Sequence, residues 1–255
     1  DLLETTIRYL GTVAVMAHVH SERSCEFVDE VLVGGLRRIT LGRWLGLLRD
    51  VAGAAGGPDG LWMPELYSAA LARPGRPAPM LRKLEGLVRF RNQQRHHGGA
   101  SGESELEALL EEQVPRMDEV LKGLSFLADY PLVHLERMAF KKGRFEYRLQ
   151  RCMGSHSTFE RETLMTSMPH EINHLYLAKP DGAELLPLHP TMLLAPSGQG
   201  FDTLFFLVGS DPNGCEYGEF LHGHQHRPED PADALDALDV LRDAARERLR
   251  AVESQ

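Results

Sequence analysis

Cysteine is scarce in this sequence, which contains only three in 255 residues. Cys25, Cys152 and Cys215 lie far apart, and no Cys-x-x-Cys pair occurs. A disulfide framework or a thiolate zinc site needs several cysteines at regular spacings. We therefore expect neither of these, and we expect a reducing, cytoplasmic environment.

Long apolar runs are also missing. No run approaches the roughly 18 apolar residues of a membrane-spanning helix, so we expect no membrane partner. The first residues, Asp1 to Thr6, lack an initiator Met and the basic segment of a signal peptide. Such a start is typical of a domain within a larger protein, and we expect the other domains of that protein among the partners.

Two common ligand and catalytic motifs are incomplete. Residues 53–60 are rich in glycine but lack the Lys-Ser/Thr of a phosphate-binding loop. Ser155-His156-Ser157 lacks the Gly-x-Ser-x-Gly turn that exposes the serine of many hydrolases. We therefore expect no cofactor and no serine hydrolase.

Positive charge is in deficit overall but is concentrated in one stretch. The net charge of -9 argues against a surface that binds nucleic acid everywhere through its phosphates. Residues 73–97 nevertheless carry seven Arg or Lys and a single acidic residue, Glu85. A solvated helix face is one interpretation of this basic stretch, and a local nucleic-acid-binding patch is the other. The residues expected in that patch are Arg82, Lys83, Arg89, Arg95 and His97.

Apolar residues recur at helical spacing in the first half of the chain. Ile7, Leu10, Ala14 and Ala17 mark one buried stripe, and Thr40 can cap a later helix. Helices are predicted over residues 2–20, 24–37, 41 to the glycines at 53–57, 65–71, 79 to the glycines at 98–99, and 103–128. Pro115 should kink or interrupt the last of them.

From residue 130 onward the apolar pattern changes toward alternation, which indicates strands. Hairpins are predicted from residues 133–140 with 144–151 and from 172–178 with 183–188, followed by strands at 192–194, 203–208 and 216–222. A helix over residues 231–252 should pack on the sheet, or else pair weakly with a partner. We therefore predict an α+β protein: an all-α bundle (1–130), a small antiparallel sheet or barrel of roughly six strands (131–227) and a C-terminal helix (228–255).

The basic stretch ends in Arg91-Asn92-Gln93-Gln94-Arg95-His96. On an ideal helix Asn92 and His96 share a face, and Arg91 lies about 140° around from His96. One helix makes an incomplete site, but two copies related by a two-fold axis would complete it. An imidazole that moves protons beside a guanidinium that holds phosphate suits phosphodiester cleavage, and the 2′-OH of RNA can serve as nucleophile without a metal.

Arg91-Asn92-x3-His96, late in a helix of an α bundle and followed by glycine, resembles the signature of the HEPN superfamily. The resemblance covers about residues 1–130. It implies a homodimer through the bundle, with a metal-independent endoribonuclease site at the interface. Arg91 and His96 would be catalytic, with Asn92 as their polar partner. The β-rich second half, with Leu185-Leu186-Pro187-Leu188 and Leu204-Phe205-Phe206, resembles domains that follow HEPN-like bundles in large bacterial signalling proteins. We therefore expect a larger bacterial signalling or defence protein.

Two alternatives to a nuclease remain. In the first, the bundle is a catalytically inactive dimerisation or sensor module, and the β domain binds a partner or ligand. In the second, the motif only stabilises the fold: Arg91 pairs with an acidic residue of the next helix, and Asn92 and His96 cap the helix end.

Histidines also recur in the second half. His222, His224 and His226 alternate along a predicted strand near Cys215 and Glu219, a pattern compatible with a metal site. We favour a polar edge strand instead, because no residues that would orient the ligands accompany them. His170, His174 and His189 are interpreted as scattered surface or satisfied polar positions. We therefore predict no metal site.

Overall fold

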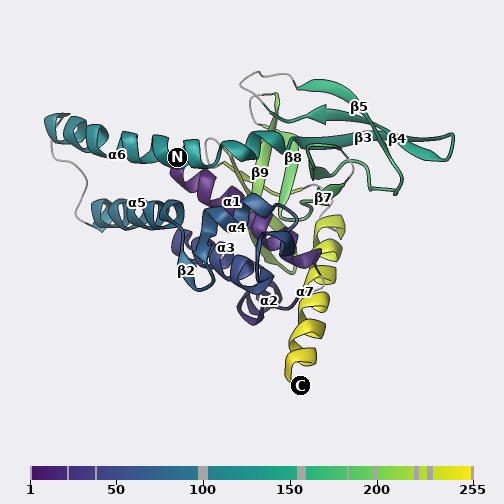
Figure 1. Ribbon diagram of the computed structural model, residues 1–255. Coiled ribbons are helices and arrows are strands. Elements are labelled where there is room, and N and C mark those ends of the chain that lie inside the picture. Colours follow the sequence, from purple (N-terminus) through teal and green to yellow (C-terminus); the bar gives the residue numbers. More distant parts are fainter. Residues whose placement is uncertain are drawn as a thin grey trace. The chain divides into compact units, whose positions relative to one another are not determined.

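The computed structural model describes residues 2–21, 23–37, 39–96, 103–153, 159–182, 184–197, 200–220, 224–228 and 232–253 (Figure 1). The chain is α+β, as predicted: helices come first, antiparallel sheets follow, and a helix ends the described chain. It divides into two compact units. We call residues 1–28 and 39–126 the helical unit, and residues 29–38 and 127–255 the strand-rich unit.

The helices of the first half lie close to their predicted positions. Their bounds are α1 (Leu2–Val19), α2 (Glu26–Val33), α3 (Leu41–Ala55), α4 (Pro64–Ala70), α5 (Pro79–His96) and α6 (Glu103–Gly123). Short elements join them: η1 (Pro58–Gly60), β1 (Leu71–Arg73), β2 (Arg76–Pro77) and η2 (Ser125–Asp129). The predicted cap of α3 is confirmed, because the side chain of Thr40 accepts a hydrogen bond from the backbone N–H of Arg43 at 3.3 Å.

Helix α1 is the centre of the helical unit. The predicted stripe is buried, and burial extends to every residue from Leu10 to His18. Gly11 allows α3 to approach closely, since a Cβ at this position would lie 2.4 Å from the Trp44 ring. A helix buried on all sides needs neighbours on all sides, and α3 and α5 of the same unit both contact α1.

Helix α6 corrects one prediction. Pro115 lies inside the helix and does not end it. The helix instead ends at Gly123, five residues before the predicted end, and η2 follows. Figure 1 shows α5 and α6 side by side, and Lys83 of α5 pairs with Glu119 of α6.

The strand-rich unit contains two open antiparallel sheets where a single sheet or barrel was predicted. The first sheet has the order β5-β4-β3-β6-β7, with β3 (Leu132–Lys141), β4 (Arg144–Arg151), β5 (Glu160–Thr166), β6 (Leu175–Ala178) and β7 (Leu185–Pro187). The two predicted hairpins are confirmed as β3–β4 and β6–β7. Strand β5 was not predicted, because it is an exposed edge strand with little apolar alternation.

The second sheet has the order β11-β10-β9-β8, with β8 (Met192–Pro196), β9 (Asp202–Asp211), β10 (Gly214–Glu219) and β11 (Gln225–His226). Helix α7 (Ala232–Glu253) contacts β10, which confirms that it packs on a sheet. The Nε of Arg248 donates to Asp29 at 2.8 Å and ties α7 to the part of α2 that belongs to this unit.

Among the described residues, none of the helices is long and apolar enough to traverse a lipid bilayer.

Candidate functional site

The Arg91-to-His96 motif forms the last turn and a half of α5. The Nη2 of Arg91 donates to Oε2 of Glu4 on α1 at 2.6 Å. The Arg91 side chain is 18% exposed. The other oxygen of Glu4 lies 2.7 Å from Nη2 of Arg8. Two guanidinium groups therefore share one carboxylate, and the three residues together carry a net charge of +1.

The rest of the motif is arranged differently from Arg91. Asn92 is exposed to solvent, as is Arg89 one turn earlier. The side chains of Arg95 and His96 lie outside the described part of the chain, as does all of His97. The structure therefore places Arg91 against α1 and Asn92 in solvent. The described residues do not show where the His96 side chain lies relative to Arg91.

One acidic partner of Arg91 lies on α1, at the start of the chain. If the motif only stabilised the fold, the acid was predicted on the next helix, which is α6. The acidic side chains at the start of α6 lie outside the described residues, so that pairing stays a prediction. Helix α5 contacts α1, and the charged end of Arg91 finds a partner there.

Three of the five predicted patch residues can be placed. Arg82, Lys83 and Arg89 are all exposed on α5. Arg82 donates to the backbone carbonyl of Pro77 at 3.3 Å. Lys83 is bound to Glu119, and this hydrogen bond lowers the pKa of the Glu119 carboxyl. The charge of Lys83 is therefore partly offset, whereas Arg82 and Arg89 lie about 20° apart around the helix and expose one basic face.

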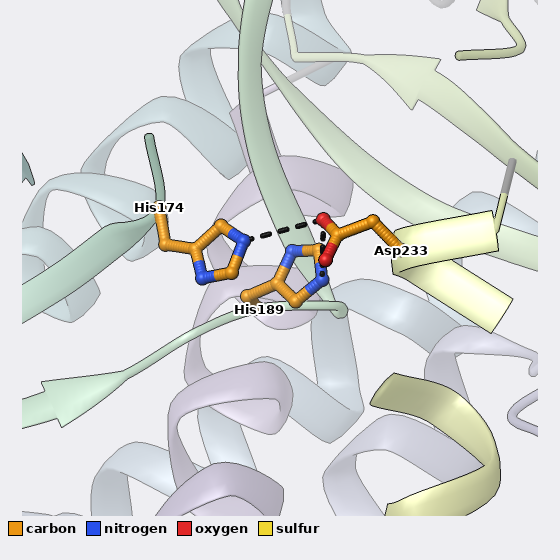
Figure 2. Close-up of side chains that lie close together, drawn as sticks. All are labelled: His174, His189 and Asp233. Carbon is orange, nitrogen blue, oxygen red and sulfur yellow. Dashed lines mark hydrogen bonds and ion pairs between the residues drawn. The ribbon is translucent and has the colours of Figure 1, made fainter. Parts of the chain in front are cut away.

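A second constellation, His174, His189 and Asp233, lies wholly within the strand-rich unit (Figure 2). The two imidazole rings stack with their centroids 3.9 Å apart and their planes 5° from parallel. Oδ2 of Asp233 lies 3.3 Å from Nε2 of His174 and 3.4 Å from Nε2 of His189. The histidine side chains are 12% and 11% exposed, and Asp233 is 65% exposed.

Backbone structure brings the two histidines together. The β6–β7 register pairs Tyr176 with Pro187, and two further steps along it set His174 opposite His189. The turn after β7 is held by a hydrogen bond of 2.9 Å from the Tyr217 hydroxyl to the carbonyl of Pro190. Partners in an antiparallel pair point to the same face, so their rings stack.

The two rings have different surroundings. The Nδ1 of His174 lies 3.2 Å from Oε2 of Glu171, so His174 is placed between two carboxylates. Burial lowers the pKa of His189, the neighbouring His174 lowers it further, and Asp233 acts in the opposite direction. The Nε2 of His189 is buried, lies 3.4 Å from Oδ2 of Asp233 and makes no hydrogen bond within the described residues.

The interpretation of His174 and His189 as scattered positions was therefore wrong. Of the alternating histidines nearer the end, His226 lies in an edge strand, as was favoured, and His224 precedes that strand. His226 belongs to edge strand β11 and contacts the Phe205 ring, with centroids 4.9 Å apart. His224 lies 3.9 Å from the buried Glu219. His222 lies outside the described residues, as does Ser155-His156-Ser157.

The chain matches no protein-family model, no curated protein and no solved structure.

Proposed function

We propose that the helical unit is a HEPN-type endoribonuclease module that cuts RNA without a metal ion. The observation that carries the proposal is the position of the motif. It ends α5, and Glu4 holds its guanidinium at the start of α1, a helix that is buried from Leu10 to His18. A fixed guanidinium is suited to phosphate, because little side-chain entropy is lost when it binds.

The charge at this position also favours an anion. Arg8 and Arg91 both contact Glu4, and Arg82 and Arg89 are exposed on the same helix as the motif. An RNA strand that reaches Arg91 would therefore meet a basic surface on a protein that is acidic overall.

The proposed reaction uses the 2′-hydroxyl of RNA as the nucleophile. One imidazole removes the proton of that hydroxyl as its oxygen attacks the adjacent phosphorus. The bond from phosphorus to the 5′-oxygen breaks, and a second imidazole protonates the leaving oxygen. His96 and His96 of the partner subunit supply the two imidazoles, and Arg91 offsets the growing negative charge on the phosphate.

Helix α6 supports a dimer through the bundle. It exposes Leu110, Val114 and Leu121 at spacings that place them on one face, and their exposed fractions are 53%, 58% and 40%. An apolar stripe at this spacing is the usual contact surface of a paired helix. We define these three residues as the α6 stripe.

The test is cleavage of labelled single-stranded RNA in EDTA by the purified chain. We expect His96→Ala to slow cleavage by about 10²–10⁴-fold, the usual share of an acid or base. Arg91→Lys keeps a charge beside Glu4 but loses the planar fork, and we expect a loss of about 10²–10³-fold. Arg49→Ala, which removes an exposed Arg of α3, is the matched control and should cleave normally.

The Arg91–Glu4 contact also favours a second candidate, a catalytically inactive dimerisation or sensor module. In this case Glu4 neutralises Arg91 and the pair serves only to hold α5 on α1. This module would leave RNA intact, and Arg91→Lys would change thermal stability alone. Cleavage that is equal in wild type and His96→Ala would contradict the nuclease proposal.

We also infer a cytoplasmic location within a larger bacterial signalling or defence protein. None of the three cysteines forms a disulfide, and Cys152 and Cys215 are buried. Burial raises the pKa of the Cys152 thiol to about 12, so this residue stays a protonated, unreactive core residue.

A further inference from the structure

We propose that His174, His189 and Asp233 bind a divalent transition-metal ion, with Zn²⁺ as the best fit. The proposal concerns the strand-rich unit and is independent of the nuclease proposal. It rests on the spacing of the ligand atoms, the orientation of the His174 ring, and the buried Nε2 of His189.

The spacing of the ligand atoms fits a tetrahedral ion. Zinc lies 2.0–2.1 Å from a histidine nitrogen and at a similar distance from a carboxylate oxygen, so neighbouring ligand atoms are roughly 3.3–3.4 Å apart. The two distances from Asp233 Oδ2 to the Nε2 atoms of His174 and His189 are 3.3 and 3.4 Å. Two of the distances between ligand atoms that a tetrahedral zinc site requires are therefore already present.

His174 is oriented as a metal-binding histidine. Its Nδ1 lies 3.2 Å from a carboxylate oxygen of Glu171, and its Nε2 lies 3.3 Å from Asp233. With an ion bound, Nδ1 would keep the proton and point it at Glu171, and Nε2 would present its lone pair to the ion. A carboxylate behind a histidine ligand is the usual arrangement that fixes the ring and makes it more basic. The Tyr176 hydroxyl, which donates to the Glu171 carbonyl at 3.0 Å, holds the Glu171 backbone in place.

His189 supplies a buried nitrogen that lacks a hydrogen bond. Its Nε2 is shielded from solvent, and no described group bonds to it with acceptable geometry. A buried polar atom in this state costs free energy unless something satisfies it. A metal ion between the two rings and Asp233 would satisfy it.

The stacked rings must rotate slightly to bind one ion, because parallel lone pairs do not converge. Rotation about the bond between Cβ and the ring is inexpensive, since this torsion is broad for histidine. The three ligand atoms already lie within 4.8 Å of one another. Asp233 is mostly exposed, so water can occupy the fourth position, as in zinc sites with three protein ligands.

An ion-pair cluster is the competing explanation. In that case a proton takes the place of the metal, and His174 bridges Glu171 and Asp233 as an imidazolium. The two explanations differ in stoichiometric metal binding and in the spectrum of a bound ion, so direct binding measurements separate them.

The experiment titrates the metal-free full chain with Zn²⁺ by isothermal calorimetry at neutral pH. We expect one site per chain. Loss of an outer carboxylate weakens metal sites by about 10–100-fold, and we expect this for Glu171→Gln. Loss of a ligand should cost more, so His174→Ala, His189→Ala and Asp233→Asn should each weaken binding by more than about 100-fold.

Controls separate this site from other zinc ligands and from misfolding. Asp233→Asn changes an exposed side chain, so its melting curve without metal should match wild type. His226→Ala and Cys25→Ser remove possible ligands elsewhere and should bind as wild type does. Co²⁺ should give the intense visible absorption of a tetrahedral site in wild type and in these two controls, and not in Asp233→Asn. No stoichiometric binding by wild type, or equal binding by Asp233→Asn, overturns the proposal.

Discussion

Single carboxylates hold polar or charged side chains in place at several points of this molecule. Glu4 is shared by two arginines, and Asp233 contacts two histidines. Asp29 is fully buried and contacts Arg248 through two guanidinium nitrogens, at 2.8 and 2.7 Å. A buried carboxylate without a cation is costly, so the loss of such a partner should matter more than the loss of a surface pair.

Arg248→Met should therefore destabilise the strand-rich unit. Breaking a fully buried pair costs about 3–5 kcal/mol, and we expect about 2–3 kcal/mol here because Arg248 is 17% exposed and water screens it. The measurement is urea unfolding of the single variant.

The double variant Asp29→Leu with Arg248→Met is the control for this prediction. It removes both charges and should recover most of the lost stability. A double variant as unstable as the single one would show that packing, and not the ion pair, is lost. Arg246→Met, which breaks an exposed pair on the same helix, should cost less than about 1 kcal/mol.

At the scale of elements, the α6 stripe is the apolar surface that most needs an explanation. Most of the described side chains of α6 are exposed, and the buried Val120 lies near its C-terminal end. Three exposed apolar residues on one face of an acidic helix are stabilised by contact with another apolar surface. A second copy of the chain is the partner that the proposed nuclease requires.

Val114→Glu combined with Leu121→Glu should convert the dimer to a monomer, because each would place a charge in an apolar interface. Analytical ultracentrifugation at several protein concentrations measures this change. Val240→Glu, at an exposed apolar position of α7, is the matched control and should leave the dimer intact. A wild-type chain that is monomeric at all concentrations would refute the prediction.

Several elements could be predicted from the sequence because local chemistry determines them. Thr40 and the glycines after α3 fix that helix at both ends, and Lys142-Gly143 forms a tight turn with φ angles of 50° and 79°. The continuation of α6 through Pro115 could not be predicted. A proline forbids a local hydrogen bond, and only the rest of the fold decides whether the helix tolerates the loss.

The His174 site shows why pairing register limits sequence analysis. The predicted hairpin had its turn near residue 181 but no defined register. The observed pairs end at Tyr176 opposite Pro187, and two further steps in the same register set His174 opposite His189. A shift of one residue turns every side chain of a strand to the other face, so the histidine pair could not be found without the register. Asp233 is harder still to assign from the sequence. It is distant along the chain, and the packing of α7 brings it beside the two histidines.

At the scale of the whole molecule, the two units have separate cores. The strand-rich unit packs Leu135, Tyr147 and Leu149 of the first sheet around Tyr176, whereas the helical unit packs around α1. Both tryptophans, Trp44 and Trp62, belong to the helical unit. Tryptophan fluorescence therefore reports on the helical unit, and hydrogen exchange of β3–β4 peptides reports on the other.

Zinc should stabilise only one of the two units. At a zinc concentration 100 times the dissociation constant, binding adds about 2.7 kcal/mol to the unit that holds the site. We expect slower exchange in β3–β4 peptides and an unchanged urea midpoint of tryptophan fluorescence. Asp233→Asn should show neither change. A zinc-dependent shift of the fluorescence midpoint would mean that zinc stabilises the helical unit, and it would contradict the prediction.

Helix α7 is attached at two points that are 15 residues apart, a distance of roughly 22 Å along its axis. Asp233 holds its first turn near the two histidines, and Arg248 holds its last turns at Asp29. A helix is stiff along its axis, so a change at one attachment is transmitted to the other. Metal binding at the histidine site would hold the first turn of α7 more firmly, and the effect would be felt at the Asp29–Arg248 contact near the other end of the helix.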